Sequence, residues 1–247
     1  MNLKQQGISA LVGGIAGAAL ALAVVAAGVF SSGQAVTDSR IRSYLMSHPD
    51  IVMAMINQAQ LNQAQDEERQ QQQAVDKVGA KRFFDPAVAY VTGPANAKNT
   101  FVEFFDYNCV HCRNSVATVK KFYEAHRSDT RFAFIDYPIF GEESTAAAQI
   151  AVAARQQGDR YVQLHFSLMG ASGEVTGDVA FKSAQSLGFD MKKLMTDAGS
   201  TAAHQDITSV HRLGEEAALQ GTPTFIINGK VHSGEITDEE LAQLTKK

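Results

Sequence analysis

The sequence predicts an α/β fold, in which a βαβ unit is followed by a helical insertion and then by a β-hairpin and a last helix. Residues 100–105 are dense in aromatic and β-branched side chains, as in a strand that is buried on both faces. Residues 142–220 have a helical pattern throughout. The strand pattern returns at residues 224–227 and is followed by Asn228-Gly229, a strong hairpin turn. A helical segment and an apolar N-terminal stretch precede this domain.

These patterns divide the chain into three parts: residues 1–35, residues 36–80, and an α/β domain at residues 81–247 with its helical insertion at about residues 142–220. A hydrophobic content of 45% in 247 residues is sufficient for a substantial core. The net charge of -4 is mild and the 22 Lys and Arg residues are spread thinly. The composition therefore argues against nucleic acid as a partner.

The N-terminal part is long and apolar. Residues 7–33 carry no charge, and residues 8–30 are long enough to span ~30 Å of hydrocarbon as a helix. Lys4 and the amino terminus precede this stretch, so the positive-inside rule places the rest of the chain outside the cytoplasm. The stretch is either an uncleaved membrane anchor or a signal peptide cleaved near residues 33–35. Both interpretations deliver the domain across the membrane.

Residues 36–80 predict a polar helix with an apolar stripe. Thr37 or Asp38 can cap its start, and Pro49 is expected to break or restart it. The stripe consists of Ile41, Tyr44, Leu45, His48, Ile51, Val52, Met55, Ile56 and Ala59. From residue 62 the segment offers almost nothing apolar to bury. We therefore expect an oligomerisation element followed by a helical stalk; the alternative is a helix that folds back on its own domain.

The domain is expected to begin near Phe83, where residues 83–86 and 88–91 suggest a first short strand. The strand at residues 100–105 leads into Cys-x-x-Cys, after which Val116, Val119, Phe122 and Tyr123 give the next helix one buried side. Residues 131–139 form a second apolar strand. It should run parallel to the first, with a right-handed crossover. After the insertion and the hairpin, residues 237–240 predict a capping box at the start of the final helix.

The thiol chemistry of the chain is confined to Cys109 and Cys112, which are the only cysteines in its sequence. The position of Cys109 at a helix N-terminus stabilises its thiolate, the form that is the nucleophile in disulfide exchange. We expect Cys109 to be exposed and to attack, and Cys112 to be shielded and to resolve the mixed disulfide. His111, between them, can donate a hydrogen bond or positive charge to the Cys109 thiolate. A stabilised thiolate makes the corresponding disulfide oxidising.

A zinc site would need two further ligands beside the cysteines. The remaining histidines of the domain are scattered without paired spacing, at His126, His165, His204, His211 and His232. The sequence therefore predicts no metal and no cofactor.

The motifs resemble those of the DsbA-like thiol:disulfide oxidoreductases of the bacterial envelope. The resemblance rests on the strand at 102–105 leading to Cys109-Val110-His111-Cys112, on residues 221–225 (Gly-Thr-Pro-Thr-Phe), and on residues 136–141 followed by an alanine-rich helix. It covers residues from about 83 to the C-terminus and implies a thioredoxin fold with an inserted α-helical domain. The segment at 41–56 is similar to the N-terminal extension of the ScsC-like branch, in which such segments oligomerise the protein.

The resemblance implies roles for residues beyond the cysteines. Pro223 matches a cis-proline, and the preceding Thr222 matches the residue that hydrogen-bonds extended substrate peptides. Glu103 matches a buried acidic residue below the cysteines. Because burial raises the pKa of a carboxyl group, Glu103 could relay the proton of Cys112. A carboxyl group satisfied by hydrogen bonds, with no catalytic role, is the alternative.

The predicted function is a periplasmic enzyme that forms, and through oligomerisation reshuffles, disulfide bonds in unfolded or misfolded exported proteins. We expect a homodimer or homotrimer through residues 36–75, and a membrane redox partner of DsbB or DsbD type. The Val-His dipeptide shares its histidine with strongly oxidising members of the family but lacks their proline. A dedicated reductase for a narrow client set and a peptide-binding periplasmic chaperone are the alternatives.

Overall fold

The computed structural model describes residues 37–246, so the apolar segment at residues 1–35 lies outside the described residues and both interpretations of it stay predictions. The chain divides into two compact units, Met1–Ala64 and Gln65–Lys247. In the first unit, residues 37–47 are helical and a second helix, α2 (Pro49–Val78), begins at Pro49. The predicted break of the helix at this proline is confirmed.

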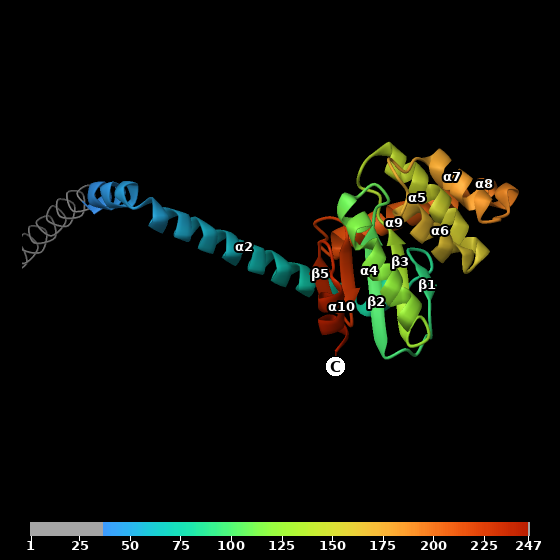
Figure 1. The fold of residues 1–247 in the computed structure, drawn as a ribbon, viewed down its shortest axis with the longest axis horizontal. Coiled ribbons are helices and arrows are strands. Elements are labelled where there is room, and N and C mark those ends of the chain that lie inside the picture. The colour runs from blue at the N-terminus through green and yellow to red at the C-terminus, as the bar shows by residue number, and fades with distance from the viewer. Residues whose placement is uncertain (1–36, 247) are drawn as a thin grey trace, which may run out of the picture. The chain divides into compact units, whose positions relative to one another are not determined.

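A five-stranded sheet organises the second unit (Figure 1). Its strands are β1 (Tyr90–Thr92), β2 (Asn99–Phe105), β3 (Thr130–Asp136), β4 (Thr224–Ile227) and β5 (Lys230–Ser233), in the spatial order β1-β3-β2-β4-β5. β2 and β3 are parallel, and the other neighbouring pairs are antiparallel. The predicted βαβ unit and hairpin are therefore confirmed.

The helices of the second unit follow the predicted order. Beyond α2 they are α3 (Ala80–Phe83), α4 (Val110–His126), α5 (Glu142–Ala154), the 3₁₀ helix η1 (Arg155–Gln157), α6 (Arg160–Met169), α7 (Gly177–Ser186), α8 (Met191–Ala198), α9 (Thr201–Glu216) and α10 (Asp238–Thr245). α5 to α9 form the insertion between β3 and β4. The predicted capping box is present at α10, where Thr237 and Glu240 exchange hydrogen bonds.

Two strand boundaries predicted from the sequence are wrong. Phe83 lies in the short helix α3 and not in a strand, and β1 begins only at Tyr90. The Asp85 side chain accepts a hydrogen bond from the Ala87 backbone, which favours a turn here. The second strand ends at Asp136 and does not reach residue 139, because Pro138 cannot donate a ladder hydrogen bond.

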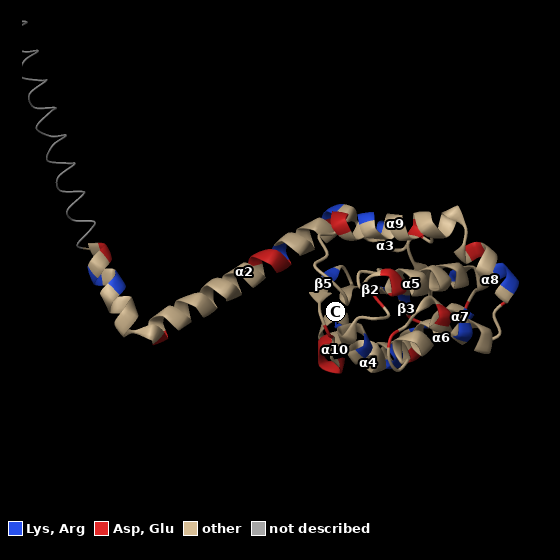
Figure 2. Cartoon of the chain, turned by 90° about the horizontal axis from the view of Figure 1, so that it is seen from above, with Lys and Arg blue, Asp and Glu red and all other residues tan. Residues whose placement is uncertain are grey.

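The sheet separates two hydrophobic cores (Figure 2). Helices α4, α6 and α10 cover one face, and α3 and α9 cover the other. Along β2, Phe101 and Phe105 belong to the first core, whereas Val102 and Phe104 belong to the second. Since side chains alternate along a strand, Glu103 faces the α4 side with Phe101 and Phe105.

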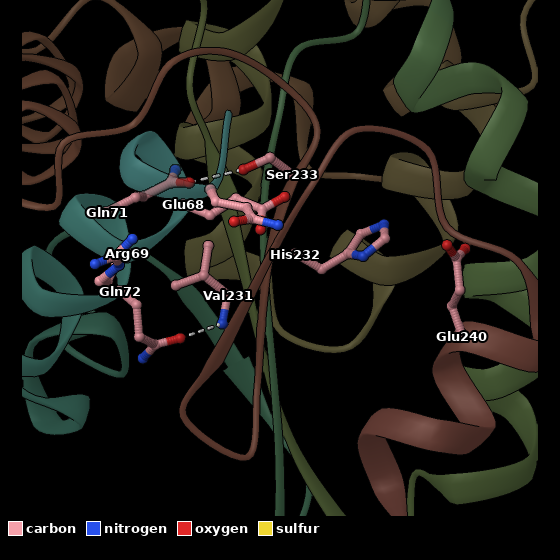
Figure 3. A pocket seen from close by; sticks show the side chains of 9 residues that line it. Glu68, Arg69, Gln71, Gln72, Val231, His232, Ser233 and Glu240 are labelled. Carbon is pink, nitrogen blue, oxygen red and sulfur yellow. Dashed lines mark hydrogen bonds between the residues drawn. The ribbon is translucent and has the colours of Figure 1, made fainter. Parts of the chain in front are cut away.

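The last turns of α2 pack against the edge strand β5 (Figure 3). The Gln72 side chain accepts a hydrogen bond from Val231 N and donates one to the Gly229 carbonyl, and Gln71 accepts one from Ser233 Oγ. These bonds satisfy backbone groups that an edge strand otherwise leaves open. A cavity of about 750 Å³ lies beside them, and none of the predicted site residues lines it. Part of the segment at 36–80 therefore contributes to the domain.

Candidate active site

Cys109 and Cys112 lie at the start of α4, and both thiols are free. Cys109 is the N-cap residue with extended backbone angles, and Cys112 is one turn further in and fully buried. The expectation that Cys109 is exposed is wrong, since only 1% of the residue is accessible. The loop that ends at Pro223 covers it, and the Cys109 thiol donates a hydrogen bond of 3.1 Å to the Thr222 carbonyl oxygen.

The surroundings lower the pKa of the Cys109 thiol to about 5. The largest cause is a hydrogen bond from the Cys112 thiol, and burial opposes it. Further hydrogen bonds from the Thr222 side chain and from the backbone N–H groups of Cys112 and His111 also lower this pKa. In the structure, where Cys109 is a thiol, the Thr222 hydroxyl has no hydrogen-bond partner among the described residues. It can therefore donate a hydrogen bond to the Cys109 thiolate when that forms.

The pKa of Cys112 moves in the opposite direction. Burial is the largest cause, and it raises the pKa of the Cys112 thiol far above its ordinary range. The hydrogen bond with Cys109 and the charge of Glu103 raise it further. At neutral pH the pair therefore consists of a Cys109 thiolate and a protonated Cys112, which is the asymmetry that attack and resolution require.

The His111 ring points toward an acidic partner that the sequence did not reveal. Its Nδ1 lies 2.6 Å from Glu235 Oε1, and the same oxygen accepts a hydrogen bond of 2.8 Å from the Asn114 side chain. The hydrogen bond with Glu235 raises the pKa of His111, and the charge of Cys109 adds to this. The sequence predicted that His111 gives the Cys109 thiolate a hydrogen bond or a positive charge. The hydrogen bond comes from the His111 backbone N–H, and the ring interacts with the thiolate through its charge.

Thr222 and Pro223, which directly precede β4, lie beside Cys109. The peptide bond between them is cis, as predicted. Thr222 lies against Cys109 through its carbonyl oxygen, and Pro223 is buried at the start of β4. The role of Thr222 in holding substrate peptides stays a prediction.

Glu103 is buried beneath the cysteines, as predicted. Burial raises the pKa of its carboxyl group to about 8. Its Oε2 has no hydrogen-bond partner among the described residues, which disagrees with the alternative of a carboxyl group fully satisfied by hydrogen bonds. Its role as a proton relay stays a prediction.

Asp106 organises the loop beside the cysteines and was missed in the sequence. Its carboxylate accepts hydrogen bonds from the backbone of Asn108, Ile139 and Phe140 and from the Ser144 hydroxyl. Its backbone carbonyl also accepts a hydrogen bond from Cys109 N. Asp106 thereby joins the end of β2 to the loop after β3. An acidic residue directly after a buried strand was the only signal.

Within residues 37–246 there is no group of three or more His, Cys, Asp or Glu side chains that could hold a metal ion. The described residues also include no helix that is long and apolar enough to cross a membrane.

The site places a reactive dithiol on a thioredoxin-like sheet and helices, which defines a thiol oxidoreductase. The family model described as thioredoxin matches residues 87–247, and the chain belongs to this family. A thioredoxin-like oxidoreductase from Silicibacter pomeroyi is 34% identical, with a TM-score of 0.60 over 66% of this chain and 92% of that one. The DsbA-like resemblance seen in the motifs is confirmed at the level of family and fold.

Two further solved structures show the same fold. BcfH of Salmonella enterica Typhimurium is 24% identical, with a TM-score of 0.74 over 90% of this chain and 97% of that one. The catalytic domain of Proteus mirabilis ScsC is 22% identical, with a TM-score of 0.62 over 70% and 95%. At these identities the likeness concerns the fold alone.

Among curated proteins the chain is similar to part of several Na⁺/H⁺ antiporters named NhaA. The match to one from Salinispora tropica is 27% identical over 164 residues, which is 64% of this chain and 24% of the antiporter. The chain thus spans about a quarter of the length of the curated relatives it matches.

Proposed function

We propose that the protein introduces disulfide bonds into exported proteins in the periplasm. The observation that carries the proposal is the opposite shift of the two thiol pKa values, with Cys109 at about 5 and Cys112 far above its ordinary range. A Cys109 thiolate that is stable at neutral pH favours the reduced form of the pair. The disulfide is then a good oxidant of client thiols.

The reaction proceeds by two exchanges. A client thiolate attacks Cys109 Sγ of the Cys109–Cys112 disulfide, forms a mixed disulfide, and releases Cys112, which takes up a proton. A second client thiolate then attacks the client sulfur of the mixed disulfide. Cys109 leaves as its stabilised thiolate, the client is oxidised by two electrons, and the pair is reduced. The Thr222–Pro223 loop, which covers Cys109, holds the client chain beside the reacting sulfur.

The periplasmic location rests on residues 8–30, which either anchor the chain in the inner membrane or direct its export. An oxidase of this kind needs a membrane partner of DsbB type to reoxidise Cys109 and Cys112. An isomerase needs a partner of DsbD type to keep them reduced.

A second activity, disulfide isomerisation, is supported by the first unit. Its described helices expose large apolar side chains, namely Ile41, Tyr44, Met46, Met53, Met55, Ile56 and Leu61. Burial of such side chains between copies would form a homodimer or homotrimer, which presents more than one dithiol to a misfolded client.

Trapping of mixed disulfides tests the exchange reaction. Cys112→Ser removes the resolving thiol, so it should accumulate mixed disulfides with client proteins, whereas Cys109→Ser should accumulate none. Non-reducing gels of cells that express each variant measure this. Trapping by Cys109→Ser alone would reverse the assignment of the two thiols.

The direction of exchange is tested by equilibration of the protein with glutathione buffers. We expect a potential nearer to the ~-120 mV of a strong oxidant than to the ~-270 mV of a reductant. A value at the reducing end would instead assign the protein as a dedicated reductase.

A further inference from the structure

A second titratable side chain faces Glu103 in the core beneath the cysteines. His165 projects from α6 toward β2, and its Nε2 lies 4.0 Å from Glu103 Oε2. Both residues are buried, with accessibilities of 1% and 2%. Neither Glu103 Oε2 nor His165 Nδ1 has a hydrogen-bond partner among the described residues. The ion-pair distance recorded for either side chain among the described residues is the one between them.

The walls around this pair are aromatic. The ring centroid of His165 lies 4.5 Å from that of Phe105, 4.8 Å from that of Phe134 and 4.9 Å from that of Phe166. An apolar side chain at this position of α6 would be buried without the cost of an unpaired polar group. Packing alone therefore does not explain why this position of α6 holds a histidine.

The other ionisable groups around the pair come from each element packed on it: Cys112 of α4, Tyr107 of the loop after β2, Asp136 of β3, Arg155 of η1 and Tyr161 of α6. Asp136 is paired with a cation, since its Oδ2 accepts hydrogen bonds of 2.5 Å from Arg155 and 3.0 Å from Tyr161. No Lys or Arg is recorded as a partner of Glu103 within residues 37–246, and the charge of Glu103, like that of Cys109, raises the pKa of Cys112.

We propose that His165 is a positioning residue for Glu103: its neutral imidazole faces the Glu103 carboxyl group and favours the carboxylate, which takes the proton of Cys112. This inference rests on the proposed thiol-disulfide exchange. Burial favours the neutral form of both groups: it raises the pKa of Glu103 to about 8 and lowers that of His165 to about 3. The neutral imidazole keeps its own ring proton, and with that proton on Nε2 its N–H dipole faces Glu103 Oε2 and favours the carboxylate.

The proton movement matters in the step that resolves a mixed disulfide. Cys112 loses its proton to the Glu103 carboxylate, and its thiolate attacks Cys109 Sγ. The Cys109–Cys112 bond forms, the bond from Cys109 to the client sulfur breaks, and the client leaves as a thiolate. Glu103 keeps this proton, and His165 remains neutral throughout. In the opposite direction the carboxyl group returns the proton to Cys112 as it leaves the disulfide.

The test follows the reaction of reduced protein with oxidised glutathione between pH 5 and 9, with acid quenching and mass spectrometry. The first phase is attack by Cys109, and the second is resolution by Cys112. In the wild-type protein the rate of the second phase should rise with pH and level off near pH 8, where Glu103 ionises. His165→Leu should move this inflection upward by about one pH unit, because the Glu103 carboxylate loses the N–H dipole of the imidazole. Resolution at pH 7 should then be about tenfold slower, with the first phase unchanged.

Matched variants separate positioning from packing. Glu103→Gln should abolish the inflection. Tyr161→Phe, which removes the hydroxyl group bonded to Asp136 but keeps the ring stacked on His165, should keep it. His165→Gln retains a side-chain N–H group, so it should keep the wild-type inflection. His165→Phe, which removes the N–H group but keeps a ring, replaces His165→Leu if that variant does not fold. A wild-type profile of the second phase in His165→Leu or His165→Phe, the same shift in His165→Gln as in His165→Leu, or equal slowing of both phases would overturn the proposal. Failure of the wild-type protein to form any mixed disulfide would instead overturn the proposed function.

Discussion

Glu103 makes the stability of the protein depend on pH in a definite direction. Its pKa is raised from 4.5 to about 8 in the folded protein, so the folded chain holds this proton more tightly than the unfolded chain does. The resulting stabilisation is complete below about pH 4.5 and is lost as pH rises through 8. At its steepest the loss is about 1.4 kcal/mol per pH unit.

We therefore predict that Glu103→Gln flattens this dependence. The free energy of unfolding, measured by urea denaturation of the oxidised protein with circular dichroism, should fall less steeply between pH 5 and 8 in the variant. The disulfide form is used because Cys109 and Cys112 then do not titrate. Parallel curves for the two proteins would show that Glu103 keeps an ordinary pKa.

His111 provides a second test at the level of one residue. Its hydrogen bond with Glu235 raises its pKa, so Glu235→Gln should bring this pKa back toward its ordinary value. Titration of the imidazole C–H signals by NMR measures the change directly. An unchanged His111 would mean that the pair with Glu235 does not persist in solution.

The sequence revealed some of these residues and not others for a physical reason. Cys109, Cys112 and Glu103 lie within one strand and the helix that follows, so their arrangement follows from local periodicity. Glu235 and His165 reach the same site only through tertiary contacts, and a lone Glu or His in a helix or loop carries no signal of that. The burial of Cys109 was missed because the covering loop at Thr222 is distant in the chain.

At the scale of secondary structure, Asp106 holds the end of β2, the loop after β3 and the start of α5 together. Its four hydrogen bonds involve a charged acceptor that is 2% accessible. Asp106→Ala should reduce the free energy of unfolding by about 3 kcal/mol, because it leaves buried donors unpaired. Amide hydrogen exchange at Ile139 and Phe140 should also accelerate.

Asp85→Ala is the matched control for this prediction. Asp85 also accepts a hydrogen bond from a backbone N–H, but it is exposed and makes only one such bond that the structure records, with Ala87. Its substitution should cost less than about 1 kcal/mol. Equal losses in the two variants would show that the loop after β3 does not depend on Asp106.

The elements themselves were largely predictable, since β2, β3, β4 and the insertion each have a strong hydrophobic pattern. The failures occurred where a short apolar run allows two structures. Residues 83–84 have the aromatic content of a strand, yet they are buried through α3 and the turn after it, where Phe83 packs edge-to-face on Phe104. Aromatic content alone does not distinguish these cases.

At the scale of the whole molecule, the boundary between the two units decides how the oligomerisation hypothesis should be tested. The sequence suggested that residues 36–75 act as one separable segment. Gln71 and Val75, however, are buried in the second unit, where Gln71 bonds β5. Removal of residues up to 75 would expose part of that core, so a change in activity could reflect loss of stability.

A chain that begins at Gln65 avoids this problem and gives the sharper prediction. It retains the last turns of α2 and loses the exposed apolar side chains of residues 37–64. We expect it to be monomeric by light scattering, with oxidase activity kept and isomerase activity lost. In the longer chain that begins at residue 36, Met53→Glu and Leu61→Glu place a charge on exposed apolar positions and should also yield a monomer. Gln60→Glu adds the same charge at a polar position and should remain oligomeric. If the chain that begins at Gln65 still behaves as an oligomer, the contacts between copies lie in the second unit and the first unit has another role.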